Sequence, residues 1–215
     1  MRRLSSWYYG LVVVLAAAMS VVAYPRMPER VPVHWGISGE PDRWGTRFEG
    51  ALLFPIMIVG AWALLRFLPR IDPRAPNFAK MRSTYDFAVN ATLTLLLVVH
   101  GMVLASGLGY AVPVRRLTPV LVGALFAALG NVLPRARPNW WFGIRTPWTL
   151  SNDRVWARTH RVGGYAMTAA GIVILAGAAL PGVWPFAVFV VAAAAASIGP
   201  IVYSYFVWRE ETRPT

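Results

Sequence analysis

The sequence contains no cysteine, and this absence excludes several kinds of chemistry. A disulfide framework, a thiolate metal site and a thiol nucleophile all require cysteine side chains. Charged residues are also scarce: they make up 14% of the 215 residues, whereas 57% are hydrophobic and the mean hydropathy is +0.50. Soluble domains of this length are far less apolar, so the composition indicates a membrane protein.

Acidic residues are few, with 9 against 21 basic ones and a net charge of +12. In a soluble protein this charge would suggest nucleic acid as a partner. Basic residues beside apolar segments are instead what anionic lipid and the positive-inside rule require. We therefore expect membrane lipids as partners and no direct contact with nucleic acid.

Six apolar runs approach or reach the length of about 20 residues needed to cross a bilayer. They are residues 7–24, 51–68, 87–110, 117–133, 163–181 and 184–208. We predict an all-α membrane protein: a six-transmembrane-helix bundle with a compact extracytoplasmic loop and an interfacial cytoplasmic helix. Residues 1–68 would form an N-terminal helix pair with the outer loop 25–49, and residues 69–215 a four-helix region with the inner loop 134–162. Alternatively, the first run is a signal peptide cleaved after Ala23.

The distribution of basic residues predicts the orientation of these spans. Fifteen flank the side that holds both termini, and six flank the other side. The N- and C-termini are thus expected in the cytoplasm, with a multi-pass chain in the membrane. The fifteen are Arg2, Arg3, Arg66, Arg70, Arg74, Lys80, Arg82, Arg135, Arg137, Arg145, Arg154, Arg158, Arg161, Arg209 and Arg213; the six are Arg26, Arg30, Arg43, Arg47, Arg115 and Arg116.

Polar groups inside the predicted spans are rare. His100 lies near the middle of the third run, and no run has a central Asp or Glu, which argues against ion-coupled transport. We interpret His100 as a neutral residue hydrogen-bonded between helices rather than as a proton relay.

The outer loop alternates Val31, Val33 and Trp35 and then becomes rich in glycine, which predicts a short extended segment followed by tight turns. The carboxylates of Glu40 and Asp42 are expected to pair with Arg43 and Arg47. One alternative is a metal or acid-base site formed by its histidine and carboxylates. The candidate binding residues in this loop are His34, Gly39, Glu40, Asp42 and Arg43.

The inner loop contains an aromatic, turn-rich part followed by a short predicted helix, capped by Ser151 or Asn152. At 100° per residue, its three arginines fall on one side of the helix and Trp156, His160 and Gly163 on the other. We expect Trp140, Trp148 and Trp156 to anchor the loop. The arginines of the helix, Arg154, Arg158 and Arg161, would remain free for a partner or for lipid phosphate. The candidate binding residues are Asn139, Trp140, Gly143, Arg145, Thr146, Trp148, Asn152, Trp156, Arg158, His160 and Arg161.

The stretch NWWFGIRTPWTLSNDRVWARTHRVGG resembles the signature of the SdpI family, bacterial membrane proteins named for immunity to a secreted toxin. The outer stretch VPVHWGISGEPDRWG is similar to the small domain of unknown function usually found at the N-terminus of those proteins. The resemblance implies an immunity or sensor role in the bacterial plasma membrane, in which the protein protects against or senses a membrane-active toxin or envelope stress. Its partners would be a peptide toxin outside and a cytoplasmic regulator inside, which would give it a part in toxin resistance or signalling. A transporter or lipid-binding protein for an anionic ligand is the alternative function.

An enzymatic function is not expected. His34 or His160 would be the base, but no nucleophile, metal constellation or phosphate-binding loop accompanies either one. We also expect no cofactor and no bound metal.

Overall fold

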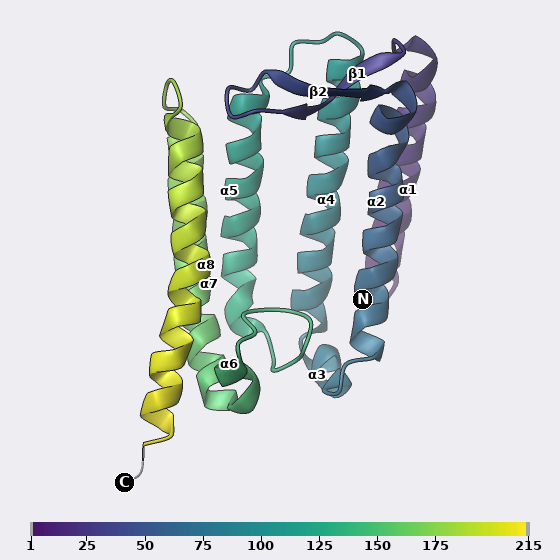
Figure 1. Cartoon of the computed structure of the whole chain (residues 1–215). Helices are drawn as coiled ribbons and strands as arrows, with labels where there is room; N and C mark the ends of the chain where they lie inside the picture. The colour runs from purple at the N-terminus through teal and green to yellow at the C-terminus, as the bar shows by residue number, and fades with distance from the viewer. Residues whose placement is uncertain (1, 214–215) are drawn as a thin grey trace. The chain divides into compact units, whose positions relative to one another are not determined.

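The computed structural model describes residues 2–213, with side chains from residue 7 onward, and most of this part is helical (Figure 1). In chain order the elements are α1 (Arg2–Ala23), η1 (Tyr24–Arg26), β1 (Arg30–Trp35), β2 (Pro41–Thr46), α2 (Arg47–Phe67), η2 (Leu68–Arg70), α3 (Ala75–Lys80), α4 (Arg82–Gly107), α5 (Val114–Val132), η3 (Leu133–Arg135), α6 (Pro147–Ser151), α7 (Asp153–Gly177) and α8 (Trp184–Glu211).

Five helices of the described residues are long and apolar enough to cross a membrane, and the chain is a multi-pass membrane protein. They are α1, α2, α4, α5 and α8, each within a few residues of a predicted apolar run. The remaining predicted span, residues 163–181, lies mostly in α7, which is not among the five. The first turns of α7 carry charged residues, so its apolar part is short.

The chain separates into two compact units, and the first comprises Met1–Leu65 with Val89–Thr118. Its core contains Val31 of β1, packed among Met27, Ala51 and Leu104. His100 is fully buried here, and its Nε2 lies 3.0 Å from Ser20 Oγ and 3.3 Å from the carbonyl oxygen of Ala16. The prediction that His100 is hydrogen-bonded between helices is therefore confirmed, since its partners lie on α1.

The outer loop forms an antiparallel β-hairpin, so an all-α description is incomplete. Only one extended segment was predicted there, because the second strand, Pro41–Thr46, lacks an alternating apolar pattern. Figure 1 shows the two strands lying across one end of the helices of this unit. β2 forms a strand because it pairs with β1, although its own sequence has no strand pattern.

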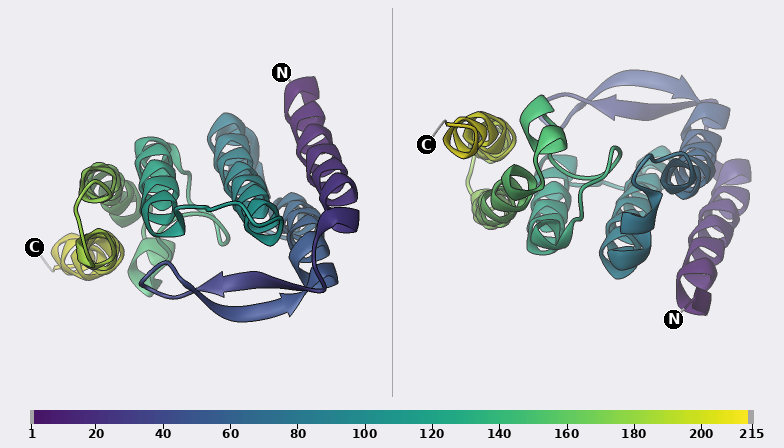
Figure 2. Two further views of the ribbon diagram at one scale, coloured as in Figure 1. Left: turned by 90° about the horizontal axis from the view of Figure 1, so that it is seen from above. Right: turned by 90° about the horizontal axis from the view of Figure 1, so that it is seen from below.

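The second unit comprises Arg66–Ala88 with Pro119–Thr215. Here α7 and α8 pack side by side, as both views of Figure 2 show. Helix α7 also approaches α5 closely: a Cβ placed on Gly130 would lie 2.8 Å from the carbonyl oxygen of Gly164. Small residues allow such contact between membrane helices.

The interfacial helix is not a separate element. Residues from Asp153 onward run without interruption into the apolar part of α7, giving a helix of 25 residues. The prediction of a separate short helix was wrong, because Gly163 and Gly164, where the interfacial helix would meet the apolar run, lie buried within one continuous helix. Helical glycines are tolerated where neighbouring residues pack against them.

Candidate functional site in the inner loop

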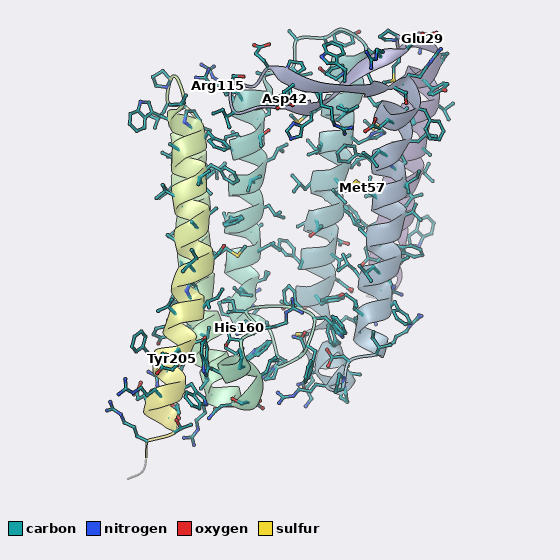
Figure 3. The ribbon with its side chains drawn as sticks, viewed as in Figure 1. Glu29, Asp42, Met57, Arg115, His160 and Tyr205 are labelled. Carbon is teal, nitrogen blue, oxygen red and sulfur yellow. The ribbon has the colours of Figure 1, made fainter. Side chains whose placement is uncertain are left out.

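The inner loop is built around His160, which is fully buried on α7 (Figure 3). Its Nδ1 lies 2.8 Å from the carbonyl oxygen of Trp156, so Nδ1 carries the proton and donates it. Its Nε2 then accepts a hydrogen bond of 2.9 Å from the N–H of Ile144. The two partners fix a neutral imidazole in one tautomer.

Burial lowers the pKa of His160 to about 4, although its hydrogen bond to the Trp156 carbonyl acts in the opposite direction. The indole of Trp156 stacks on the imidazole with ring centroids 4.0 Å apart, and its Nε1 donates to the carbonyl of Ala136 at 2.9 Å. Trp156 is only 1% exposed. This pair therefore joins the start of the inner loop to its middle.

Gly143 has a φ of +109°, a backbone conformation that residues with a Cβ rarely adopt. A Cβ at this position would lie 2.3 Å from Nε2 of His160. Glycine is thus required both by the backbone conformation and by the approach of the imidazole. Gly143 thereby allows the N–H of Ile144 to reach Nε2 of His160.

The segment after Gly143 is held by hydroxyl groups. Thr146 caps α6, accepting from the N–H of Thr149 at 3.1 Å, while the Thr149 hydroxyl accepts from the N–H of Thr146 at 2.9 Å. The Thr146 hydroxyl also lies 3.0 Å from that of Ser204 on α8. Pro147 at the first helical position suits this capping arrangement.

The segment before Gly143 turns around Asn139, which is fully buried. Its Oδ1 accepts from the N–H groups of Trp141 and Phe142 at 2.8 and 2.6 Å, and its Nδ2 donates to the carbonyls of Arg137 and Phe142. An asparagine that bonds the backbone on both sides makes a rigid turn. Asn139 is therefore a structural centre of the loop.

The three predicted tryptophan anchors differ in burial. Trp156 is buried as expected, and Trp148 is half-buried with its ring edge-on to Tyr205, at a centroid distance of 5.2 Å. Trp140, however, is 49% exposed, so its prediction as a buried anchor was wrong. Its backbone N–H is held instead, by Asp72 at 2.8 Å.

The division of α7 into two faces is confirmed, but two of the three arginines are not free. Arg158 contacts Glu210 at 3.0 Å and Glu211 at 3.2 Å, both on α8, and Arg154 lies 3.6 Å from Glu211. Arg161 is exposed. The two glutamates lie about 50 residues away in the sequence, so helical periodicity could not reveal the pairing.

Asn152 is the N-cap of α7, as predicted, and accepts from the N–H groups of Arg154 and Val155 at 2.8 and 3.2 Å. Asp153, in the first turn, pairs with Arg74 at 2.8 Å. Both acidic charge and a capping oxygen are favourable at a helix N-terminus.

Sequence reasoning missed Asp72, which is 5% exposed and supports the loop from the η2–α3 segment. Its two carboxylate oxygens accept from the N–H groups of Arg74 and Trp140 at 2.6 and 2.8 Å. From the same segment Asn77 donates to the carbonyl of Pro138 at 2.7 Å. The signal was an acid among the basic residues of this connection, between Arg70 and Arg74.

The outer candidates lie on the hairpin of the first unit, where Figure 3 labels Asp42. Asp42 bonds Nδ1 of His34 at 2.5 Å, and Arg43 pairs with Glu49 at 2.8 Å, so the expected pairing of Asp42 with Arg43 or Arg47 was wrong. The hairpin brings His34 and Asp42 together across its strands, whereas sequence spacing favoured neighbours.

Gly39 and Glu40 occupy the hairpin turn. Gly39 has a φ of +82°, and the carbonyl of Glu40 accepts from the N–H of Gly36 at 3.0 Å. The side chain of Glu40 is exposed. Among the described residues no group of three or more His, Asp or Glu side chains could hold a metal ion.

Two protein families match the chain. Residues 135–204 match the SdpI/YfhL protein family, and residues 11–59 match the domain of unknown function DUF1648. The chain carries an SdpI/YfhL domain. The resemblance seen in both loops is thereby confirmed. The inner loop and α7 lie within the region that matches SdpI/YfhL, whereas their partners on the η2–α3 segment and at the end of α8 lie outside it.

Individual proteins are also similar to the chain, and one of them bears the SdpI name. The chain is 25% identical over 164 residues to the "Immunity protein SdpI" of Bacillus subtilis (strain 168). The aligned region covers 76% of each chain. It is 35% identical over 52 residues to the "Uncharacterized membrane protein YbgB" of the same organism, covering 24% of this chain and 57% of that one. An "Uncharacterized protein" of Archaeoglobus fulgidus is 33% identical over 69 residues, covering 30% and 37%. No solved structure matches the chain.

Proposed function

We propose that the protein is a membrane immunity protein that protects a bacterial cell against a membrane-active peptide toxin. The observation that carries the proposal is the similarity to the Bacillus subtilis immunity protein over 76% of both chains. Its proposed partners are a peptide toxin outside, a cytoplasmic regulator inside and membrane lipids around the helices.

The outer hairpin is the surface that we assign to the toxin. The hairpin is anchored by the buried Val31, while Ile37 and Trp44 of the hairpin and Phe48 at the start of α2 are 61%, 54% and 59% exposed. Exposed large apolar side chains beside charged ones are found at protein and membrane contact sites. Such a surface suits an amphipathic peptide.

A survival assay tests the immunity role. Cells of a toxin-sensitive bacterium that express the full chain should survive several membrane-active peptides better than cells without it. The double variant Ile37→Ser and Trp44→Ser should lose protection, and Tyr110→Ser, which changes a 68% exposed residue outside the hairpin, should retain it. Unchanged killing by every peptide tested would refute the proposal.

The orientation is also a proposal. We assign six spans, with residues 163–181 as the fifth, both termini in the cytoplasm and residues 25–49 outside. The asymmetry of basic residues supports it. A periplasm-active reporter fused at about residue 150 should be silent, and one fused at about residue 38 should be active; the reverse pattern would overturn the orientation.

A further inference from the structure

A cavity of about 440 Å³ opens beside the inner loop, wholly within the second unit. Its walls include Leu129 of α5, Met167 of α7 and Ile201 of α8, so most of the lining is apolar. Its volume falls in the range of small-molecule sites, about 300–1,000 Å³. Arg145 is the charged residue of its lining.

The position of Arg145 is fixed by hydrogen bonds of its neighbours in the chain. Its preceding neighbour Ile144 is held by His160 and its following neighbour Thr146 by Thr149. The guanidinium donates from Nη1 to the carbonyl of Trp140 at 2.6 Å. This fixed position lowers the conformational entropy that a ligand contact would cost.

The charge of Arg145 is not neutralised locally. Several other arginines of the unit meet carboxylates, as Arg74 meets Asp153, but no carboxylate of the described residues lies within 4.0 Å of Arg145. A guanidinium has five N–H donors, and the bond to Trp140 uses one of them. The others are suited to an oxyanion, which arginine binds in bidentate fashion.

We propose that this cavity binds an anionic phospholipid from the surrounding bilayer, with its phosphate on Arg145 and part of one acyl chain in the apolar cavity. The site matches both parts of a phospholipid: the single cation of its lining, Arg145, suits the phosphate, and its apolar walls suit an acyl chain. A second cavity, between α7 and α8, is lined by alanine, valine and tryptophan and has no charged residue, so it offers no such match. The proposal does not depend on the immunity role.

Native mass spectrometry of the purified full chain tests this site. The chain is equilibrated in micelles with equal amounts of phosphatidylglycerol and phosphatidylcholine, and the retained lipids are counted. We expect the wild type to prefer phosphatidylglycerol and Arg145→Gln to lose about tenfold of that preference, as a charge-assisted contact would. Arg137→Gln, an exposed arginine outside the cavity, should keep it.

Two further arms separate headgroup from chain. Dodecyl phosphate should displace the retained lipid, whereas inorganic phosphate and dodecanol at the same concentration should not. Ser197→Trp, which fills the cavity from α8, should reduce retention, and Ala194→Trp, on the same helix but outside the lining, should not. If Arg145→Gln unfolds, Ser197→Trp and the three competitors still decide the question.

Three results would overturn the proposal. Equal losses in Arg145→Gln and Arg137→Gln would mean that general surface charge attracts the lipid. Displacement by inorganic phosphate as efficient as by dodecyl phosphate would mean an ion site in which the cavity plays no part. Full retention in Ser197→Trp would mean that the lipid binds elsewhere.

Discussion

Replacing Gly143 by alanine should disrupt the inner loop much more than its small change in volume suggests. Alanine at a φ of +109° costs about 1–3 kcal/mol in backbone strain. The new Cβ would also lie 2.3 Å from Nε2 of His160, so the imidazole must move and release the N–H of Ile144. A buried N–H without a partner costs about 1–3 kcal/mol more.

The two costs, strain at Gly143 and a lost hydrogen bond at the N–H of Ile144, together come to about 4 kcal/mol. In a protein of this size 1 kcal/mol corresponds to a change in melting temperature of about 2–4 °C, so Gly143→Ala should melt about 8–16 °C below the wild type. Gly182→Ala is the matched control in the same unit. Its φ is +62° and no atom lies within 4 Å of a new Cβ, so only strain of about 1 kcal/mol remains.

Thermal unfolding in detergent, followed by tryptophan fluorescence, measures both variants. A double-mutant cycle sharpens the test: in a His160→Ala background the clash is gone, so Gly143→Ala should cost only its backbone strain. An equal effect of Gly143→Ala in both backgrounds would refute the role assigned to the imidazole. So would equal melting temperatures for Gly143→Ala and Gly182→Ala.

Three further predictions concern the same loop. Burial lowers the pKa of His160 from 6.5 to about 4, so as pH falls the unfolded chain binds a proton at this histidine before the folded chain does. The free energy of unfolding should therefore be highest above pH 6.5 and decline by about 3 kcal/mol toward pH 4. The melting temperature of His160→Gln should lack this part of the decline. Trp156→Ala should cost about 3–5 kcal/mol in unfolding free energy, and Trp140→Ala, at an exposed site, less than about 1 kcal/mol. Arg158→Gln should lower the melting temperature at low salt and less at high salt, whereas the exposed Arg161→Gln should leave it unchanged; identical salt dependence of the two variants would contradict the pairing with α8.

The helices could be predicted because their signal is local. An apolar run of about 20 residues is visible without knowing what it packs against, and the structure places a helix on each predicted run. The same local geometry predicted the face shared by Trp156 and His160. Periodicity does not show whether two neighbouring helical segments are continuous, and so it did not predict that α7 is a single helix of 25 residues.

Contacts between distant segments could not be predicted in this way. Asp72 meets the N–H of Trp140 across 68 residues, and Thr146 meets Ser204 across 58. Neither pair has a spacing that any secondary structure imposes. The contact with Asp72 holds the backbone of Trp140, so the loop does not need the ring of Trp140 as a buried anchor, and this ring is exposed.

The arginines of the inner loop show how partners, rather than helix faces, decide what a charge can do. A helical projection groups Arg154 and Arg158 as one basic surface, but both lie near glutamates of α8, which reduce their field toward an outside ligand. Arg145 has no place in that projection because it precedes the helix, yet it borders an apolar cavity with no carboxylate of the described residues within 4.0 Å. The cation best suited to an anionic ligand is therefore the one that the pattern of the helix leaves out.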